Sequence, residues 1–263
     1  MIQKERRIFL IRSLLSERAE YRNIEIPSEA AEQKQLLRAL MNVRPPIPAD
    51  PVFLKVQDEY LQAETAAKGM TDPDDLTPAE DGIYLWQGDI TTLCCDAIVN
   101  AANSGMLGCF CPCHGCIDNA VHTFAGVELR LECAEIMAEQ ESPEPPGRAK
   151  LTKAHNLPCR YVLHTVGPMV EGEVSSEDEA LLSSCYRSCL ELAGQHHLKS
   201  VAFCCISTGE FRFPNQRAAE IAVSSVKDFR SRMNDEMKVI FNVFRDSDYK
   251  IYRELLGFHQ KTL

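Results

Sequence analysis

The sequence has no long apolar run and no excess of positive charge. No stretch approaches the roughly 18 consecutive apolar residues of a membrane-spanning helix, which excludes an integral membrane protein of the helical type. Lys and Arg number 28 against 38 Asp and Glu, a net charge of −10. Nucleic-acid binding without sequence preference requires clustered cations, so this balance argues against it. A small anionic ligand stays compatible, because local backbone amides can outweigh a distant net charge.

The first residues, MIQKERRIFLIRSLLSER, contain no uncharged apolar stretch and no small-residue cleavage site, so we expect no secretory signal. They are Arg-rich and amphipathic, as transit peptides are, but Glu5 and Glu17 count against that interpretation. We therefore expect a cytoplasmic protein. Disulfides are rare in that compartment, so the 12 cysteines are expected to be reduced thiols.

Three signatures of nucleotide chemistry are also missing. There is no G-x-G-x-x-G and no Gly-rich loop ending in Lys-Ser/Thr, so neither a Rossmann dinucleotide site nor nucleoside triphosphate hydrolysis is indicated. Residues 112–116 match the P-C-x-x-C half of the zinc deaminase signature. The other half, an upstream H-x-E, cannot exist because His114 is the first histidine of the chain.

The composition, 45% hydrophobic and 25% charged, is that of an ordinary globular protein. Residues 1–79 are predicted to form a helical N-terminal extension, with helices near 4–15, 29–41 and 51–67. Ser28 is expected to begin the second helix and Pro51 the third. Pro- and Asp-rich segments separate these helices and precede a second domain, residues 80–263.

Short apolar runs alternate with amphipathic helical segments in the second domain. Strands are predicted at 83–86, 96–102, 160–166, 200–206 and 238–244, with a more exposed strand at 149–155. Helices are predicted at 118–138, 177–192, 216–230 and 248–256, the second opened by a capping box of Ser176 and Glu179 and the last ended by Gly257. This alternation predicts a three-layer α/β/α fold with a mixed, largely parallel sheet.

The cysteines fall into two groups. Six lie in apolar or helical contexts, where free cysteine is usually a buried hydrophobe: Cys94, Cys95, Cys185, Cys189, Cys204 and Cys205. Four others surround one histidine within eight residues: Cys109, Cys111, Cys113, His114 and Cys116. Zinc prefers thiolate and imidazole ligands, so this loop is a candidate metal site, catalytic if one position stays open and structural if closed. A cysteine-rich turn without metal is the alternative.

Two further segments follow predicted strands. The run 96–102 leads into N-A-A-N, which places Asn100 and Asn103 where α/β sheets generally bind ligands. The run 200–206 leads into Ser207, Thr208, Gly209, Glu210 and Phe211, a short Gly-containing turn before a helix. Such a turn can direct consecutive backbone amides at a phosphate.

Taken together, these motifs resemble the zinc-dependent class of macrodomains, which are ADP-ribosyl hydrolases. The similarity covers roughly residues 82–258, and the helical extension also resembles that class. Its markers here are G-D-I-T at 88–91, V-N-A-A-N at 99–103, C-x4-H-x-C at 109–116, C-I-D-N-A-V-H at 116–122 and I-S-T-G at 206–209. The implied fold is a three-layer α/β/α macrodomain with a helical N-terminal extension.

The resemblance also implies roles for single residues. Cys109, His114 and Cys116 would bind one Zn²⁺ per chain, although Cys111 and Cys113 are extra thiols within the same loop. Asn103 and Asp118 would be catalytic. The expected ADP-ribose site comprises Asp89 and Ile90 at the adenine, Asn103 at the distal ribose, Cys116, Ile117 and Asp118 beside it, and Ser207, Thr208, Gly209, Glu210 and Phe211 at the diphosphate.

The function implied is removal of mono-ADP-ribose from modified protein side chains, with Asp and Glu esters as the expected linkage. A lipoyl-carrier protein and a sirtuin-type ADP-ribosyltransferase are the partners that the resemblance suggests. Two alternatives stay open. One is a reader module that binds ADP-ribose without turnover and uses zinc only structurally, and the other is a hydrolase of a free ADP-ribose derivative.

Overall fold

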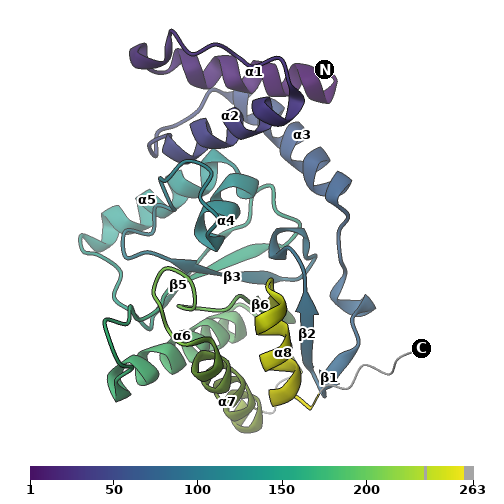
Figure 1. The fold of residues 1–263 in the computed structure, drawn as a ribbon, viewed down its shortest axis with the longest axis vertical. Helices are drawn as coiled ribbons and strands as arrows, with labels where there is room; N and C mark the ends of the chain where they lie inside the picture. Colours follow the sequence, from purple (N-terminus) through teal and green to yellow (C-terminus); the bar gives the residue numbers. More distant parts are fainter. Residues whose placement is uncertain (234–235, 258–263) are drawn as a thin grey trace.

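A computed structural model describes residues 1–233 and 236–257 of the chain. A seven-stranded sheet lies between two helical layers, and three N-terminal helices form a bundle at one end of the molecule (Figure 1). The predicted three-layer α/β/α arrangement is therefore confirmed. The end of the expected second domain, residues 258–263, lies outside the described residues.

The strands follow the order β1-β2-β7-β6-β3-β5-β4. The central strands from β2 to β5 pair in parallel, while β1 and β4 are antiparallel at the two edges, so the sheet is mixed and largely parallel as predicted. Their bounds are β1 Pro78–Glu80, β2 Ile83–Gln87, β3 Ala97–Ala102, β4 Ala149–Lys153, β5 Tyr161–Val166, β6 Ser200–Phe203 and β7 Lys238–Val243.

Helices cover both faces of this sheet. In Figure 1, α4 and α5 lie above it and α6, α7 and α8 below it. The bounds are α1 Gln3–Ser16, α2 Ala30–Val43, α3 Pro51–Lys68, α4 Ile117–Ala125, α5 Val127–Gln140, α6 Ser176–Gln195, α7 Asn215–Met233 and α8 Asp246–Leu255. Pro51 begins α3 as predicted, with Asp50 accepting hydrogen bonds from the first-turn amides.

The structure corrects three local predictions. The single helix expected over 118–138 is two helices, because Gly126 takes a φ of +98° between α4 and α5. The capping box of α6 is formed by Ser175 and Asp178 rather than by Ser176 and Glu179. The helix expected near 29–41 and opened by Ser28 spans Ala30–Val43, and its N-cap residue is Glu29, which makes no side-chain cap. In each case the hydrophobic period located the helix and left its ends undetermined.

The main core lies around the sheet. The central strands are deeply buried, with Ile98 and Val99 of β3 and Val201 of β6 fully excluded from solvent. Four of the six cysteines predicted to be core are buried, whereas Cys94 and Cys205 are half-buried. All 12 cysteines are free thiols in the structure. Cys95 just before β3, Cys204 just after β6, and Cys185 and Cys189 of α6 therefore act as small apolar side chains.

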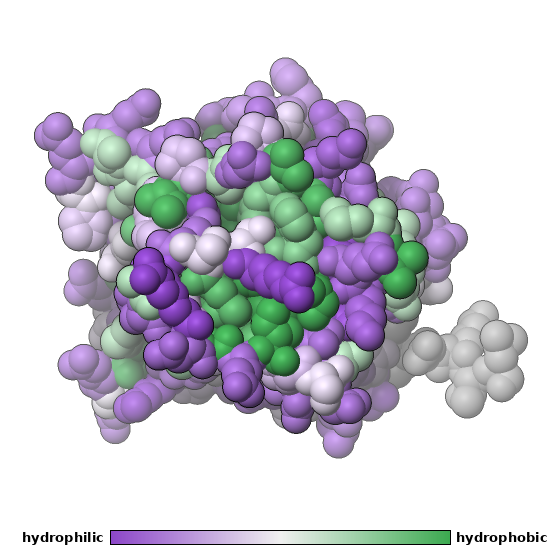
Figure 2. Space-filling view, turned by 90° about the horizontal axis from the view of Figure 1, so that it is seen from above, coloured by the Kyte–Doolittle hydropathy of each residue, from purple (hydrophilic) through white to green (hydrophobic). Residues whose placement is uncertain are grey.

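The N-terminal bundle has its own core, formed by Leu10, Leu37, Phe53 and their neighbours. Val127 at the start of α5 joins that core, and α2 and α3 both contact α4. Figure 2 looks onto the bundle and shows apolar side chains gathered between polar ones. A groove along α1 is lined by Ile2, Ile8 and Phe9. The bundle thus packs on the α4–α5 side of the sheet, not on a sheet edge.

Among the described residues, no helix has the length and apolarity needed to cross a bilayer.

We expect Ile98→Ala to lower the free energy of unfolding by about 2–5 kcal/mol, because it leaves a cavity in a fully buried strand. Urea unfolding followed by circular dichroism measures the change. Val52→Ala is the control, since Val52 is 59% exposed and its truncation should change stability by less than about 0.5 kcal/mol. Equal effects of the two substitutions would contradict the placement of β3 in the core.

Candidate metal and nucleotide site

The candidate site lies at the carboxyl edge of the parallel strands. β3 ends at Ala102 just before Asn103, β6 ends at Phe203 before the 207–211 loop, and β2 ends at Gln87 before Asp89. Because β2, β6 and β3 run in the same direction, the loops that follow them emerge at the same edge. Segments far apart in sequence meet there.

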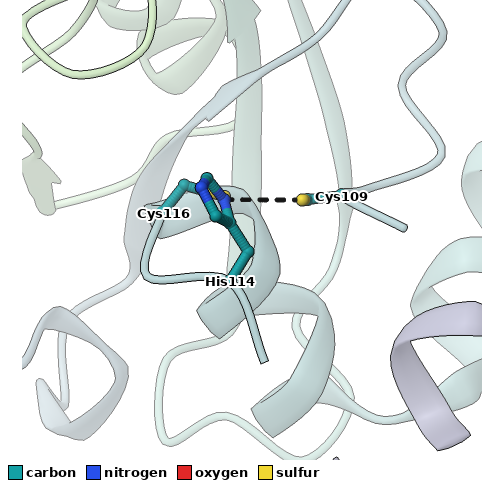
Figure 3. A group of neighbouring side chains, drawn as sticks. All are labelled: Cys109, His114 and Cys116. Atoms are coloured by element: carbon teal, nitrogen blue, oxygen red, sulfur yellow. Dashed lines mark hydrogen bonds between the residues drawn. The ribbon is translucent and has the colours of Figure 1, made fainter. Parts of the chain in front are cut away.

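Cys109, His114 and Cys116 form a cluster whose ligand atoms all lie within 4.8 Å of one another. Figure 3 shows their side chains directed at a common point, with Cys109 entering from the side opposite the other two. The Cys109 Sγ lies 3.7 Å from the His114 Nδ1. Cys111 and Cys113 are exposed and do not belong to the cluster. The fold itself thus separates three of the five candidate ligands from the other two.

The surroundings of these three side chains suit a divalent cation. Two sulfurs and one imidazole form a donor set that zinc prefers. The His114 Nδ1 faces Cys109, and its Nε2 lies 3.5 Å from the Glu210 carboxylate. A carboxylate in this position is a common outer partner that orients metal-binding histidines. Cys116 is the N-cap of α4, and its Sγ accepts the Asn119 amide, so the helix dipole favours a thiolate there.

Burial raises the pKa of the Cys116 thiol to about 12, and the neighbouring Cys109 adds to the effect. The Asn119 amide acts in the opposite direction but does not outweigh burial. Two adjacent half-buried thiolates therefore need a positive charge between them. The three residues fit a zinc ion on both donor type and electrostatics.

Asp118 lies in the first turn of α4, next to the cluster, and is 5% exposed. Asn100 Nδ2 donates to its Oδ1 at 2.8 Å, and Asn103 Nδ2 donates to its Oδ2 at 3.2 Å. Burial raises the pKa of Asp118 to about 6, although the two asparagines and the charge of Arg130 favour the ionised form. The carboxylate is thus fixed at both oxygens by residues that flank the end of β3.

Behind Asp118 lies a second, fully enclosed group: His122, Cys133 and His164. Asn100 Nδ2 donates to His164 Nδ1, so the ring proton is on Nε2, which donates to Thr152 Oγ1. Burial lowers the pKa of His164 to about 3 and that of His122 well below its usual value. His164 is therefore a neutral core histidine that supports Asn100, whereas both ring nitrogens of His122 lack a hydrogen-bond partner among the described residues.

The 207–211 loop offers a cradle for an anion. The amides of Gly209, Glu210 and Phe211 have no hydrogen-bond partner in the part of the chain that the structure describes. Ser207 has a φ of +64°, and its buried Oγ also lacks a partner among those residues. A Cβ on Gly167 would stand 2.0 Å from that Oγ, so the loop packs closely on its neighbour. Successive free amides of this kind bind phosphate.

Asp89 is the N-cap of a short 3-10 turn, Ile90–Thr92. Its Oδ1 accepts from the amide and hydroxyl of Thr91, and its Oδ2 pairs with Lys68 of α3 at 2.9 Å. Burial alone would raise the pKa of Asp89, but these hydrogen bonds and the Lys68 charge outweigh it and lower the pKa. Ile90 is buried, and Ile117 is half-buried at the start of α4. Asp89 is thus already engaged by the N-terminal bundle.

Sequence reasoning missed several residues of this region. Asn100 was noted as part of N-A-A-N but not as a partner of Asp118. Lys68 carries no local signal, because only the fold brings α3 to Asp89. The same is true of Arg38 and Asn42, which reach the cysteine loop from α2. Only Asn100 could have been found, as the polar residue of an otherwise apolar strand.

Comparison with known proteins places these features in a family. Residues 99–222 match the family model described as Macro domain. The chain is 56% identical over 261 residues to a protein-ADP-ribose hydrolase of Treponema medium, covering 98% of this chain and 100% of that one. It is 49% identical to a protein-ADP-ribose hydrolase of Staphylococcus aureus strain Mu50, covering 97% and 96%.

Solved structures of macrodomains superpose on this chain. A macrodomain of Trypanosoma brucei in complex with ADP-ribose superposes with a TM-score of 0.65 at 30% identity, covering 83% of this chain and 95% of that chain. A macrodomain of Oceanobacillus iheyensis with bound MES gives a TM-score of 0.63 at 35% identity, covering 70% and 95%. The described sheet and its flanking helices are those of a macrodomain.

The buried histidine behind Asp118 predicts a pH effect on stability. Between pH 6.5 and about 3 the unfolded state holds a proton on His164 that the native state does not, so stability falls as the pH drops through that interval. We expect the free energy of unfolding of the parent protein to fall about 1.4 kcal/mol per pH unit more steeply than that of His164→Gln. Urea titrations of metal-stripped protein at several pH values test this, and parallel curves would contradict a neutral buried His164.

Proposed function

The chain belongs to the macrodomain family, and we propose that it is a zinc-dependent protein-ADP-ribose hydrolase that removes mono-ADP-ribose from modified protein side chains. The two relatives compared above over nearly their full length are named protein-ADP-ribose hydrolases, and the chain is an enzyme of that class. The observation that supports the proposal most directly is the meeting of Asn103, Asp118, the metal-ligand cluster and the free amides of the 207–211 loop at one edge of the sheet.

The loops after β2 and β6 would bind the ADP part of ADP-ribose. The three consecutive amides at 209–211 would take the diphosphate, far from the scissile bond. Asp89 and Ile90 would take the adenine, where an amino group can share the Asp89 carboxylate with Lys68. Energy gained at these remote contacts holds the reacting carbon in place.

Residues at the end of β3 and the start of α4 would carry out the hydrolysis. Asn103 would orient a hydroxyl of the distal ribose, because its side-chain nitrogen donates to Asp118 while its side-chain oxygen accepts the Gly105 amide, which fixes the group beside the carboxylate. Asp118 would accept the proton of the attacking water at a carboxylate oxygen, and general-base help of this type is worth about 10²–10⁴ in rate. Asn100 of β3 donates a hydrogen bond to Asp118 Oδ1 and keeps the carboxylate aligned.

Cys109, His114 and Cys116 would hold the zinc ion beside these two residues. When bound, zinc supplies Lewis-acid polarisation of an oxygen ligand. Glu210 belongs to the 207–211 loop, and its carboxylate lies 3.5 Å from His114 Nε2. The loop proposed to bind the diphosphate therefore also contacts the ligand cluster.

The finer assignments rest on the family resemblance. These are the Asp/Glu ester linkage, a lipoyl-carrier protein as substrate and a sirtuin-type transferase as partner. The cytoplasmic location is likewise a prediction from the sequence. A reader module with structural zinc is the competing function. The hydrolase is favoured because the buried Asp118 sits beside Asn103 and the ligand cluster, an arrangement that binding alone does not require.

The ligand set can be tested by metal analysis. We expect Cys109→Ala, His114→Ala and Cys116→Ala each to lose most bound zinc, because each removes one of three donors from the cluster. Cys111→Ala and Cys113→Ala are matched controls in the same loop and should keep one zinc per chain, since their side chains are exposed and outside the cluster. Elemental analysis of purified proteins provides the measurement. Zinc loss from either control would overturn the assignment.

Turnover separates enzyme from reader. We expect Asp118→Asn and Asn103→Ala to lower the rate of ADP-ribose release from a mono-ADP-ribosylated protein by about 10²–10⁴, with ADP-ribose affinity changed far less. Asp228→Asn, on an exposed stretch of α7, is the control and should turn over normally. Calorimetry gives the affinity and a release assay the rate. A parent protein that binds ADP-ribose tightly yet releases none would establish the reader.

A further inference from the structure

Helix α2 of the N-terminal bundle contacts the cysteine loop through one face. Gln35, Arg38 and Asn42 are spaced three and four residues apart and therefore project from the same side of the helix. The side chains of Arg38 and Asn42 bond to the loop and to the start of α4, and the Gln35 backbone carbonyl accepts the Cys113 thiol. Each contact spans more than 70 positions of sequence, so the bundle and the loop are joined only by the fold.

Arg38 holds the loop at two places. Its Nη2 donates to the His114 carbonyl at 2.9 Å, and its Nε and Nη2 donate to Asn119 Oδ1 at 3.1 and 2.7 Å. Asn119 is fully buried, and its Nδ2 donates in turn to the Cys111 carbonyl at 3.0 Å. A single guanidinium thus fixes the backbone at His114 directly and at Cys111 through Asn119.

Asn42 holds a third place. Its Oδ1 accepts the Cys113 amide at 2.9 Å, and its Nδ2 donates to Thr123 Oγ1 of α4 at 2.9 Å. Asn42 is 1% exposed, so its bond to Thr123 is buried and its bond to the Cys113 amide is partly buried. Cys113 has a φ of +55°, a left-handed conformation that costs a non-glycine residue energy and persists only when neighbours impose it. Asn42 supplies that support.

Outside α2, the loop is held by Arg130, which stacks on Phe110 and donates to the Leu107 carbonyl, and by a turn in which the His114 amide donates to the Cys111 carbonyl. Phe110, Cys111, Pro112, Cys113 and Gly115 are all exposed, and no regular element runs between β3 and α4. A metal site made from such a segment must meet the cost of ordering its backbone when the ion binds. Contacts that order the backbone beforehand remove part of that cost.

Resting on the zinc site proposed above, we propose that α2 is a brace for the cysteine loop, and that Arg38 and Asn42 are positioning residues that preset the geometry of Cys109, His114 and Cys116. The N-terminal extension is then part of the metal site rather than an appended bundle. Neither residue touches the ion or the substrate. Both act on the loop backbone.

The brace predicts weaker metal binding when it is removed. We expect Arg38→Gln and Asn42→Ala to raise the zinc dissociation constant about 10- to 100-fold, the usual effect of losing an outer partner of a metal ligand. Competition with a chromogenic chelator measures the constant. Arg12→Ala, an exposed arginine of the same bundle on α1, is the matched control and should bind zinc as the parent does.

A second readout needs no metal. In metal-stripped protein the Cys113 amide should exchange its hydrogen faster in Asn42→Ala than in the parent or in Arg12→Ala, because its acceptor is gone. Parent-like zinc affinity and parent-like exchange in the variants would overturn the brace. The brace would also be overturned if Arg38→Gln, a change at a half-buried residue, lost zinc affinity only in proportion to a loss of helical circular dichroism. If the parent protein binds no zinc, the proposed function fails, whereas the exchange measurement still decides whether α2 orders the loop.

Discussion

The start of helix α4 is the constraint on which the rest of the site depends. Cys116 caps the helix with its sulfur, Asp118 lies in the first turn, and Asn119 uses the same turn to hold the preceding loop. One candidate metal ligand, the buried carboxylate and the anchor of the loop are therefore set by one backbone geometry. The helix dipole stabilises negative charge at that end, which suits both a thiolate and a carboxylate.

Strand β3 supplies the other half of that arrangement. Asn100 and Asn103 approach Asp118 from the sheet and occupy both of its oxygens, so the carboxylate has one orientation. The neutral His164 and Thr152 extend this hydrogen-bonded line into the core. A buried carboxylate is costly unless its partners are fixed, and here one partner belongs to β3 and the other directly follows it.

The N-terminal bundle changes how the fold is understood. A macrodomain sheet provides the nucleotide cleft, but Lys68 of α3 meets Asp89 at one end and α2 meets the cysteine loop at the other. The bundle therefore contacts the candidate site at two places, Asp89 and the cysteine loop. Val127 at the start of α5 packs in the core of the bundle and so connects the bundle to the helices that cover the sheet.

The sequence by itself determined the layered α/β/α class, the parallel sheet and the segments that carry the chemistry. Hydrophobic period and strand–helix alternation are local properties, and C-x4-H-x-C, N-A-A-N and the 207–211 turn are contiguous in the chain. Only the tertiary structure decided which thiols of the cysteine loop converge, that Gly126 breaks one expected helix into two, and that Arg38, Asn42 and Lys68 reach the site. These last features depend on contacts between residues far apart in sequence. No local pattern records such contacts, because they arise only when separate elements pack together.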